Sequence, residues 1–251
     1  MPDQTVSKDT CSVSQTKKIK IWDVPTRLFH WFLVIFVTLS YLTGEIGGLD
    51  FTIPIIDRFV SNITLHMWSG FIILALLLFR LAWGFVGSTS ARFVDFAYGP
   101  RAIIDYVKTF LRGGLKRFAG HNPAGGAMVF LMIFFLLLQA CTGLFSKDES
   151  FFATSGPLAN YITVETSEKI TALHKQNWEI ILILVLIHIC ANFIYWFWKK
   201  QNLIIAMITG QKDLPIDESL TEVRFAGVRT AAYVAIAAGT VVWFLVNVIG
   251  T

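Results

Sequence analysis

Residues 173–198 read LHKQNWEIILILVLIHICANFIYWFW, and this stretch decides the fold. It is apolar over about the length that a bilayer requires of a spanning helix, yet it contains two histidines, His174 and His188. The two lie 14 residues apart, which on an α-helix is about 21 Å of rise and almost four whole turns. Their imidazoles should therefore face the same way at two different depths of a membrane.

Four further stretches are apolar enough to cross a bilayer. They are Leu28–Gly44, Ile63–Trp83, Ala124–Phe145 and Thr230–Ile249. The chain of 251 residues is 55% hydrophobic and only 15% charged, whereas a soluble domain carries about a quarter charged residues. A helix is the only open-ended element that satisfies its own backbone in hydrocarbon. The sequence therefore predicts an all-α membrane protein with its main membrane domain over residues 21–211.

The distribution of lysine and arginine predicts how the helices are oriented. Residues 1–27, 84–123 and 199–229 hold sixteen of these cations, whereas residues 45–62 and 146–175 hold four. Cytoplasmic loops are the ones enriched in positive charge. The N-terminus is therefore expected in the cytoplasm of a bacterium and the C-terminus, after five crossings of the inner membrane, in the periplasm. The net charge of +4 is then explained by the positively charged loops that fix the orientation of the helices in the membrane. Nucleic acid is therefore not an expected partner.

The segments outside the predicted spans are expected to be a tail, a surface helix and a linker. Residues 1–20 are expected to be a disordered cytoplasmic tail, and the first fifteen lack the apolar core of a signal peptide. Apolar residues recur at helical spacing over residues 100–115, which predicts an amphipathic helix on the cytoplasmic leaflet. Residues 212–251 are expected to be a linker, acidic from Asp213 to Glu222, followed by the fifth spanning helix.

The three cysteines, Cys11, Cys141 and Cys190, are scattered, and none belongs to a C-x-x-C-H run. Covalent attachment of haem c is thereby excluded. Cys141 and Cys190 lie inside apolar stretches and are expected to be small core residues rather than a disulfide.

Two more histidines complete a pattern. His30 lies near the predicted inner end of the first spanning stretch, and His66 near the outer end of the second. Matching depths pairs His30 with His188 and His66 with His174. Iron held by two imidazoles is six-coordinate, which favours electron transfer over substrate binding. The pattern predicts two bis-histidine haems b, stacked one above the other across the membrane.

The same step of 14 residues leads from His30 to Gly44 and from His66 to Arg80. Gly44 would then leave room for the outer macrocycle, and Arg80 would meet the propionates of the inner one. A simpler explanation exists for each, because glycine is common in membrane helices and a long arginine can reach the interface. A single membrane histidine is likewise more often a packing residue than a ligand.

Three other residues are weaker candidates for haem contacts. Gly70 lies one helical turn after His66 and would allow close approach of a flat ring. Arg27 is a second candidate partner for the inner propionates, and Lys175 for the outer ones.

Four short motifs resemble the prokaryotic cytochrome b561 family, which includes the cytochrome b subunits of nickel–iron hydrogenases. They are IWDVPTRLFHW (21–31), LHMWSG (65–70), FRLAWG (79–84) and GHNPAGG (120–126). The resemblance covers residues 21–211. It implies a four-helix core with two haems b, whose ligands match His30, His66, His174 and His188 here.

A quinone site is a further expectation. The more distant formate dehydrogenase cytochrome subunits place an asparagine, a small residue and a glycine before their third helix, beside a quinone. His121, Asn122 and Gly125 resemble that turn, although Pro123 lengthens the spacing. The alternative is that these residues simply start a helix. The quinone would be ubiquinone or menaquinone.

These expectations combine into transmembrane electron transfer between quinone and a periplasmic partner, either a hydrogenase or a c-type cytochrome. The loops 45–62 and 146–172 would form the docking surface. A superoxide oxidase that reduces quinone is an alternative, weakened because the outer loops carry seven acidic residues against four basic ones. A metal-ion transporter is another, disfavoured because the histidines form two layers and Glu179 is the only carboxylate within the predicted spans.

Overall fold

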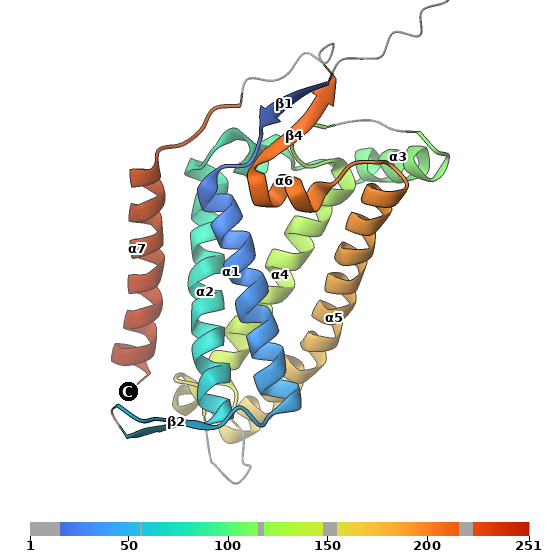
Figure 1. Ribbon diagram of the computed structural model, residues 1–251. Helices are drawn as coiled ribbons and strands as arrows, with labels where there is room; N and C mark the ends of the chain where they lie inside the picture. The colour runs from blue at the N-terminus through green and yellow to red at the C-terminus, as the bar shows by residue number, and fades with distance from the viewer. Residues whose placement is uncertain (1–15, 56, 115–117, 148–154, 216–222, 251) are drawn as a thin grey trace, which may run out of the picture.

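The computed structural model describes residues 16–55, 57–114, 118–147, 155–215 and 223–250. Five long helices run roughly side by side (Figure 1) and each is long and apolar enough to cross a membrane. They are α1 (Val24–Tyr41), α2 (Asn62–Val86), α4 (Pro123–Phe145), α5 (Val164–Phe197) and α7 (Val228–Phe244). One π-helical turn extends α1 to Ile46 and another extends α7 to Ile249. The predicted all-helical architecture with five spanning segments is confirmed.

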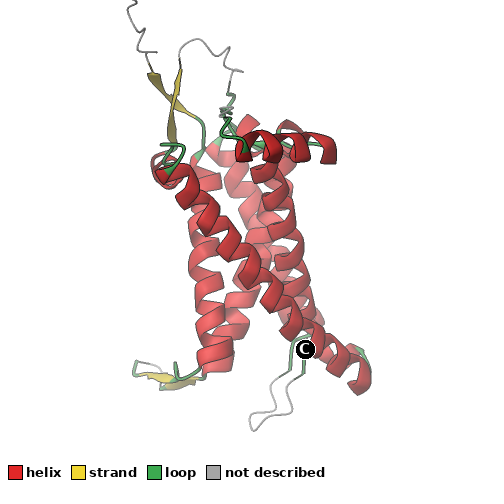
Figure 2. Cartoon of the chain, turned by 90° about the vertical axis from the view of Figure 1, so that its right-hand side faces the viewer, coloured by secondary structure: helices red, strands yellow, loops and turns green. Residues whose placement is uncertain are grey.

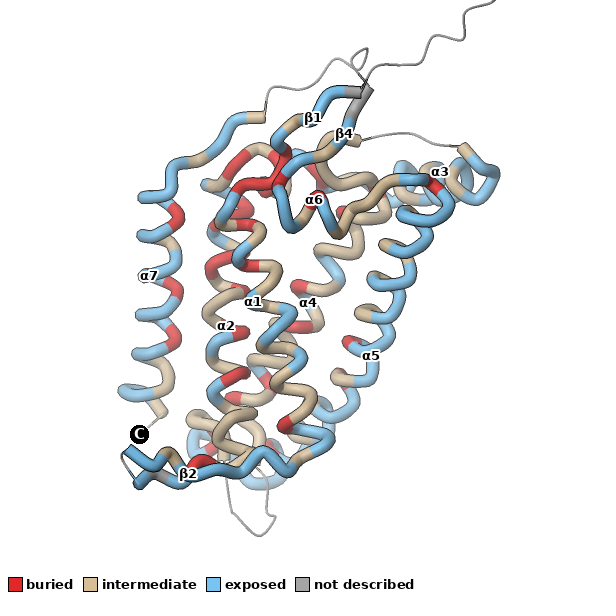
Figure 3. Tube along the Cα trace, in the orientation of Figure 1, coloured by how far each residue is buried: buried red, intermediate tan, exposed pale blue. Residues whose placement is uncertain are grey.

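Helix α2 is the centre of the assembly, because it packs against α1, α4 and α7, while α4 also packs against α5. Its buried residues outnumber those of every other helix described, as the tube in Figure 3 shows. Cys141 and Cys190, expected in the core, are exposed. The expectation was wrong because an apolar residue of a membrane protein can face lipid as readily as protein.

The helix starts are capped by side chains. Asp23, Ser61, Asn122 and Thr163 each accept a hydrogen bond from the backbone N–H three residues later, as N-caps do. The cap at Thr163 starts α5 nine residues before the predicted Leu173. The resulting helix of 34 residues is about 51 Å long, which exceeds the thickness of the hydrocarbon core of a bilayer.

Substitution of Asp23 with alanine is expected to destabilise the chain. Asp23 is 4% exposed; its carboxylate accepts the Thr26 backbone N–H at 2.7 Å and the Trp83 indole Nε1–H at 3.1 Å. The variant loses an N-cap worth about 1 kcal/mol and leaves a buried indole N–H unsatisfied at a cost of about 1–3 kcal/mol. Thermal unfolding in detergent, followed by circular dichroism, should show a lower midpoint than for Asp105→Ala on an exposed helix face. Equal midpoints for the two variants would contradict this prediction.

One end of the bundle, here called the α3 end, carries four short elements (Figures 1 and 2). They are β1 (Thr16–Lys20), α3 (Pro100–Leu111), α6 (Leu203–Thr209) and β4 (Gln211–Pro215). The helix predicted over residues 100–115 thus forms from 100 to 111, and none of its residues is buried. Its position on a lipid leaflet stays a prediction. The opposite end, called the β2 end, carries the hairpin of β2 (Phe51–Ile53) and β3 (Arg58–Val60).

The expectation of a disordered tail is wrong for residues 16–20, which form β1 and pair antiparallel with β4. The linker expected from residue 212 likewise begins as part of a strand. The pairing places Lys18 opposite Asp213, and such opposite-charge cross-strand pairs are favourable. Strands β1 and β4 are far apart in the sequence, so no local sequence pattern predicts that they pair. Residues 1–15 and 216–222 lie outside the described residues.

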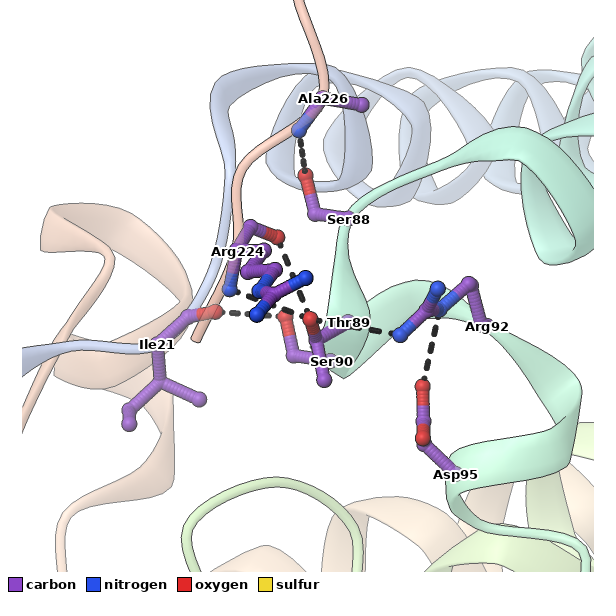
Figure 4. A network of polar contacts seen from close by, with 8 residues as sticks. All are labelled: Ile21, Ser88, Thr89, Ser90, Arg92, Asp95, Arg224 and Ala226. Atoms are coloured by element: carbon purple, nitrogen blue, oxygen red, sulfur yellow. Dashed lines mark hydrogen bonds and ion pairs between the residues drawn. The ribbon is translucent and has the colours of Figure 1, made fainter. Parts of the chain in front are cut away.

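The loop that follows α2 forms hydrogen bonds with the segment before α1 and with the segment before α7 (Figure 4). Thr89 N donates to the Arg224 carbonyl at 3.0 Å, and the Ala226 N–H donates to Ser88 Oγ at 3.0 Å. Ser90 Oγ donates to the Ile21 carbonyl at 2.6 Å. Beyond this anchor, the buried side of α7 packs onto residues of α2. The fifth helix therefore covers α2 from outside the four-helix group.

Candidate functional site

The four histidines of the predicted spans meet in two pairs. His30 of α1 faces His188 of α5 with ring centroids 6.4 Å apart, and His66 of α2 faces His174 of α5 at 6.2 Å. These are the pairs that depth matching predicts. Two metal–nitrogen bonds of about 2 Å, together with the half-widths of two rings, add up to about 6 Å. Each pair therefore has the spacing at which two imidazoles can share one metal ion.

A two-imidazole set favours haem over a bare metal site. Among the described residues, no three His, Cys, Asp or Glu side chains gather where they could hold a metal ion. Two imidazoles would fill only two coordination positions of a metal ion, so the others would need a further ligand such as a porphyrin. This geometry is unlike that of a transporter site, which gathers several protein ligands at one level.

The pair at the β2 end is oriented by hydrogen bonds. His66 Nδ1 lies 3.0 Å from the Ser40 carbonyl, and His174 Nδ1 lies 3.0 Å from the Gln139 carbonyl. A carbonyl oxygen can only accept, so each Nδ1 carries the proton and donates it. Each Nε2 then carries the lone pair with which an imidazole binds a metal. At His174 this nitrogen lies 3.1 Å from the Gln139 side-chain amide nitrogen, which donates to it here.

Two glycines lie against the same pair of imidazoles. A Cβ on Gly44 would stand 2.9 Å from His66 Cε1, and one on Gly143 would stand 3.1 Å from His174 Cε1. Gly44 thus lies beside the histidine pair at the β2 end, and its role beside a haem stays a prediction. Gly70 has open space where a side chain would begin. Sequence reasoning missed Gly143, although the dipeptide Thr-Gly occurs at both 43–44 and 142–143 and could have indicated it.

The pair at the α3 end has a different setting. His30 Nδ1 is buried and has no hydrogen-bond partner among the described residues, while its ring meets Trp31 edge-on at 5.1 Å. Asn192, one turn after His188, places its amide nitrogen 3.2 Å from His188 Nε2. Within the described part of the chain, no backbone carbonyl accepts from His30 Nδ1 in the way that the Ser40 and Gln139 carbonyls accept from the other pair.

Arg80 is a buried cation that forms no ion pair among the described residues, although the Asp23 carboxylate is near enough to interact with its charge. It is 3% exposed, and its guanidinium lies 4.8 Å from the Phe93 ring centre and 5.8 Å from that of Phe96. Its NH1 atom has no hydrogen-bond partner among the described residues, and the described ion pairs, Arg92–Asp95 and Lys169–Glu165, do not include it. An unpaired buried charge is costly. The position is therefore suited to an incoming carboxylate such as a haem propionate.

The other two predicted cations are less enclosed. Arg27 donates through one terminal nitrogen to the Ile208 carbonyl, so it lies against α6, and its buried Nε has no partner among the described residues. Lys175 is exposed.

An apolar layer lies between the two histidine pairs. Ile181 stands seven residues from both His174 and His188 on α5 and is 1% exposed. It belongs to one buried cluster with residues of two other helices, namely Ile73 and Leu77 of α2 and Leu136 of α4. Partly buried residues complete the cluster, and they include Val37, seven residues after His30. Tightly packed apolar side chains exclude water from this level.

The residues predicted for a quinone site lie at the α3 end. Asn122 caps α4 by accepting the Gly125 N–H at 2.8 Å, and its Nδ2 donates to the Tyr195 hydroxyl at 2.9 Å. Tyr195 also hydrogen-bonds Tyr106 of α3. Sequence reasoning missed both tyrosines, although Tyr195 follows His188 by seven residues and so shares its face of α5.

His121 is separated from that polar group by aromatic packing. Its ring centre lies 4.8 Å from that of Trp22 and 4.4 Å from that of Phe96. Burial of the ring, and then the nearby charges of Arg80 and Lys212, lower the pKa of His121 to about 3. The His121 imidazole is consequently neutral at physiological pH and offers no positive charge to a bound molecule.

Comparisons with known proteins agree on one family. The family model described as prokaryotic cytochrome b561 matches residues 21–210. A protein of Rhizobium leguminosarum bv. viciae named probable Ni/Fe-hydrogenase B-type cytochrome subunit is 26% identical over 79% of this chain and 90% of its own length. A protein of Rhodobacter capsulatus with the same name is 23% identical over 84% of this chain and 87% of its length. No solved structure matches. The family match covers most of the chain, from the residues before α1 to the end of α6, and the protein is therefore a member of the prokaryotic cytochrome b561 family.

Proposed function

We propose that this protein carries electrons across a bacterial inner membrane through two haems b, each held between two histidines. The observation that carries the proposal is the pair of facing imidazoles at two levels of α5, with ring centres 6.2 and 6.4 Å apart. Membership of a b-type cytochrome family implies haem b. The number of haems and their ligands are part of the proposal.

The side chains present fit haem at both levels. Bound between two imidazoles, haem b supplies reversible one-electron chemistry without an open coordination position. His30 and His188 would hold the haem at the α3 end, and His66 and His174 the haem at the β2 end. Arg80 would form an ion pair with a propionate, which would give its NH1 atom the hydrogen-bond partner that it lacks among the described residues. The cluster around Ile181 keeps water out of the region between the levels.

The proposed orientation of the protein in the membrane is based on the distribution of lysine and arginine. The α3 end carries the segments rich in lysine and arginine and is assigned to the cytoplasm. The β2 end is then periplasmic and would meet the redox partner. The relatives are named as subunits of Ni/Fe hydrogenases, so a hydrogenase is the partner we favour over a c-type cytochrome. The β2–β3 hairpin exposes Phe51, Ile55 and Phe59 at that end, in keeping with a surface that binds another protein.

Quinone would bind at the α3 end, beside Asn122, Tyr106 and Tyr195. Reduction of a quinone requires protons as well as electrons, and hydroxyl and amide groups can donate to its carbonyl oxygens. Burial raises the pKa of Tyr106 above its ordinary value, so its hydroxyl keeps the proton at physiological pH. Gly125 belongs to this site through the Asn122 cap, and His121 supports it as a neutral packing residue.

Replacement of Tyr195 with phenylalanine tests the quinone site. The variant loses one hydroxyl and leaves the Asn122 amide without its partner at 2.9 Å, a change worth about 1 kcal/mol. We expect the KM for quinone to rise roughly five- to tenfold while haem content stays unchanged. Asn122→Ser, which keeps a capping oxygen for α4 but removes the amide donor, should give a similar rise. An unchanged KM in both variants would place the quinone elsewhere.

A haem assay tests the proposal as a whole. The chain, purified from haem-replete cells, is expected to give a reduced-minus-oxidised spectrum of low-spin b-type haem at two haems per chain. Reconstitution with a hydrogenase in liposomes should couple hydrogen oxidation to quinone reduction. A ratio of one haem or none would overturn the two-haem proposal. Reduction of quinone by superoxide without any partner protein would instead favour the oxidase alternative.

A further inference from the structure

Two helix ends in this chain carry the same local arrangement. Thr43 and Gly44 lie where α1 passes into its π-helical turn, and Thr142 and Gly143 lie in the last turns of α4. In each case the threonine hydroxyl donates to the carbonyl four residues earlier at 2.7 Å, Leu39 for Thr43 and Leu138 for Thr142. Both threonines are buried. A hydroxyl that has used its proton in this way can only accept from other groups.

Each of these threonines faces a histidine of the next spanning helix. Thr142 Oγ1 lies 3.0 Å from His174 Nδ1, and Thr43 Oγ1 lies 3.5 Å from His66 Nδ1. Ser40 adds its carbonyl at 3.0 Å and its hydroxyl at 3.4 Å from the same His66 atom. The helix pairs α1–α2 and α4–α5 thus repeat one device, and the two copies hold the two imidazoles of the β2-end pair.

We propose that these two copies, Ser40–Thr43–Gly44 and Gln139–Thr142–Gly143, are a duplicated positioning device for the haem at the β2 end, and that they lower its reduction potential below that of the other haem. This inference rests on the proposed function, because it presumes haem between His66 and His174. The threonines are positioning residues that act through the imidazoles.

The effect on potential follows from the direction of the hydrogen bonds. Acceptors at Nδ1 draw the imidazole proton outward and raise the basicity of Nε2. A more basic ligand stabilises the higher charge of oxidised iron and so lowers the potential. His30, in the α3-end pair, has a buried Nδ1 with no partner among the described residues. Electrons would therefore move downhill from the β2 end towards the α3 end.

The glycines of the device set the position of the rings. Methyl groups added at Gly44 and Gly143 would stand 2.9 Å from His66 Cε1 and 3.1 Å from His174 Cε1, both closer than ordinary contact. The imidazoles of His66 and His174 could not keep their positions. Their Nε2 atoms would then turn away from the haem proposed between them.

The test is a redox titration of the purified full chain, with Thr142→Val and Thr142→Ser compared with the unmodified protein. Valine keeps the shape but removes the acceptor, so the potential of one haem should rise while the other stays constant. Serine keeps the hydroxyl and should restore the original value. The same titration in a His30→Ala background, where only the β2-end haem remains, assigns the shift to that haem. Two haems with unshifted potentials in Thr142→Val would overturn this inference and leave the proposed function standing.

A second pair of variants tests the device without relying on threonine. Gly143→Ala and Gly44→Ala should each reduce retention of the β2-end haem during purification. Gly239→Ala in α7, where an added methyl group meets nothing within 4 Å, is the matched control and should retain both haems. Full retention of both haems in the two test variants would contradict the positioning role. A chain that never binds two haems would instead refute the proposed function.

Discussion

Replacement of His188 with alanine is expected to halve the haem content of the chain and to reduce electron transfer across the membrane to background. His188 faces His30, with ring centres 6.4 Å apart, so its loss leaves one imidazole of that pair. The other pair, around His174, is about 21 Å away along α5 and should be unaffected. The measurement is the haem-to-protein ratio together with hydrogen-dependent quinone reduction in liposomes.

The companion variants make this prediction specific. His174→Ala should also remove one haem, and the remaining haem should differ in spectrum and potential from the one left in His188→Ala. His121→Asn should retain both haems, because the His121 ring packs against Trp22 and Phe96 rather than against another histidine. Loss of both haems from each single variant, or of neither, would contradict the two-level arrangement.

Replacement of Arg80 with leucine is expected to act in opposite directions on the haem-bound and haem-free chain. With haem bound, the variant loses a buried ion pair with a propionate, which typically costs about 3–5 kcal/mol. The α3-end haem should then dissociate more than about 100-fold faster. Without haem, leucine removes a buried guanidinium whose NH1 has no partner among the described residues, so unfolding should require a higher temperature. Haem transfer to an excess of apomyoglobin and thermal unfolding measure the two effects.

The controls separate charge from size. Arg80→Lys keeps a cation at the site and should retain part of the haem affinity, although it loses the fork of donors. Arg92→Leu changes an arginine that is 39% exposed and paired with Asp95, so an effect of less than about 1 kcal/mol is expected. Equal haem dissociation in Arg80→Leu and Arg92→Leu would refute the propionate assignment.

Several features were predictable because they depend on periodicity within one helix. The apolar stretches predict the spanning helices, and the 14-residue interval between His174 and His188 places two imidazoles on one face of α5. The same reasoning leads to Arg80, which is buried as a residue facing the bundle interior should be. Depth matching then predicts the partners His30 and His66. A lipid environment restricts spanning segments of this kind to helices, so helical periodicity is a more reliable basis for prediction here than in a soluble protein.

Contacts between segments distant in the sequence could not be predicted in the same way. The strand pairing of Thr16–Lys20 with Gln211–Pro215 and the bond between Asn122 and Tyr195 depend on how the helix ends meet. So does the contact of Thr142 and Gly143 with His174, because α4 carries no histidine and shows no pattern of its own.

The sequence by itself therefore determined that this protein spans a membrane with five helices and that four histidines lie at two depths. Bilayer thickness and helical rise suffice for that. Only the tertiary structure decided which groups accept the imidazole protons of His66 and His174, and which glycines lie against those rings. It also decided that the buried Arg80 forms no ion pair among the described residues. These are matters of a few ångströms between helices, and such distances are set by side-chain packing that no single helix encodes.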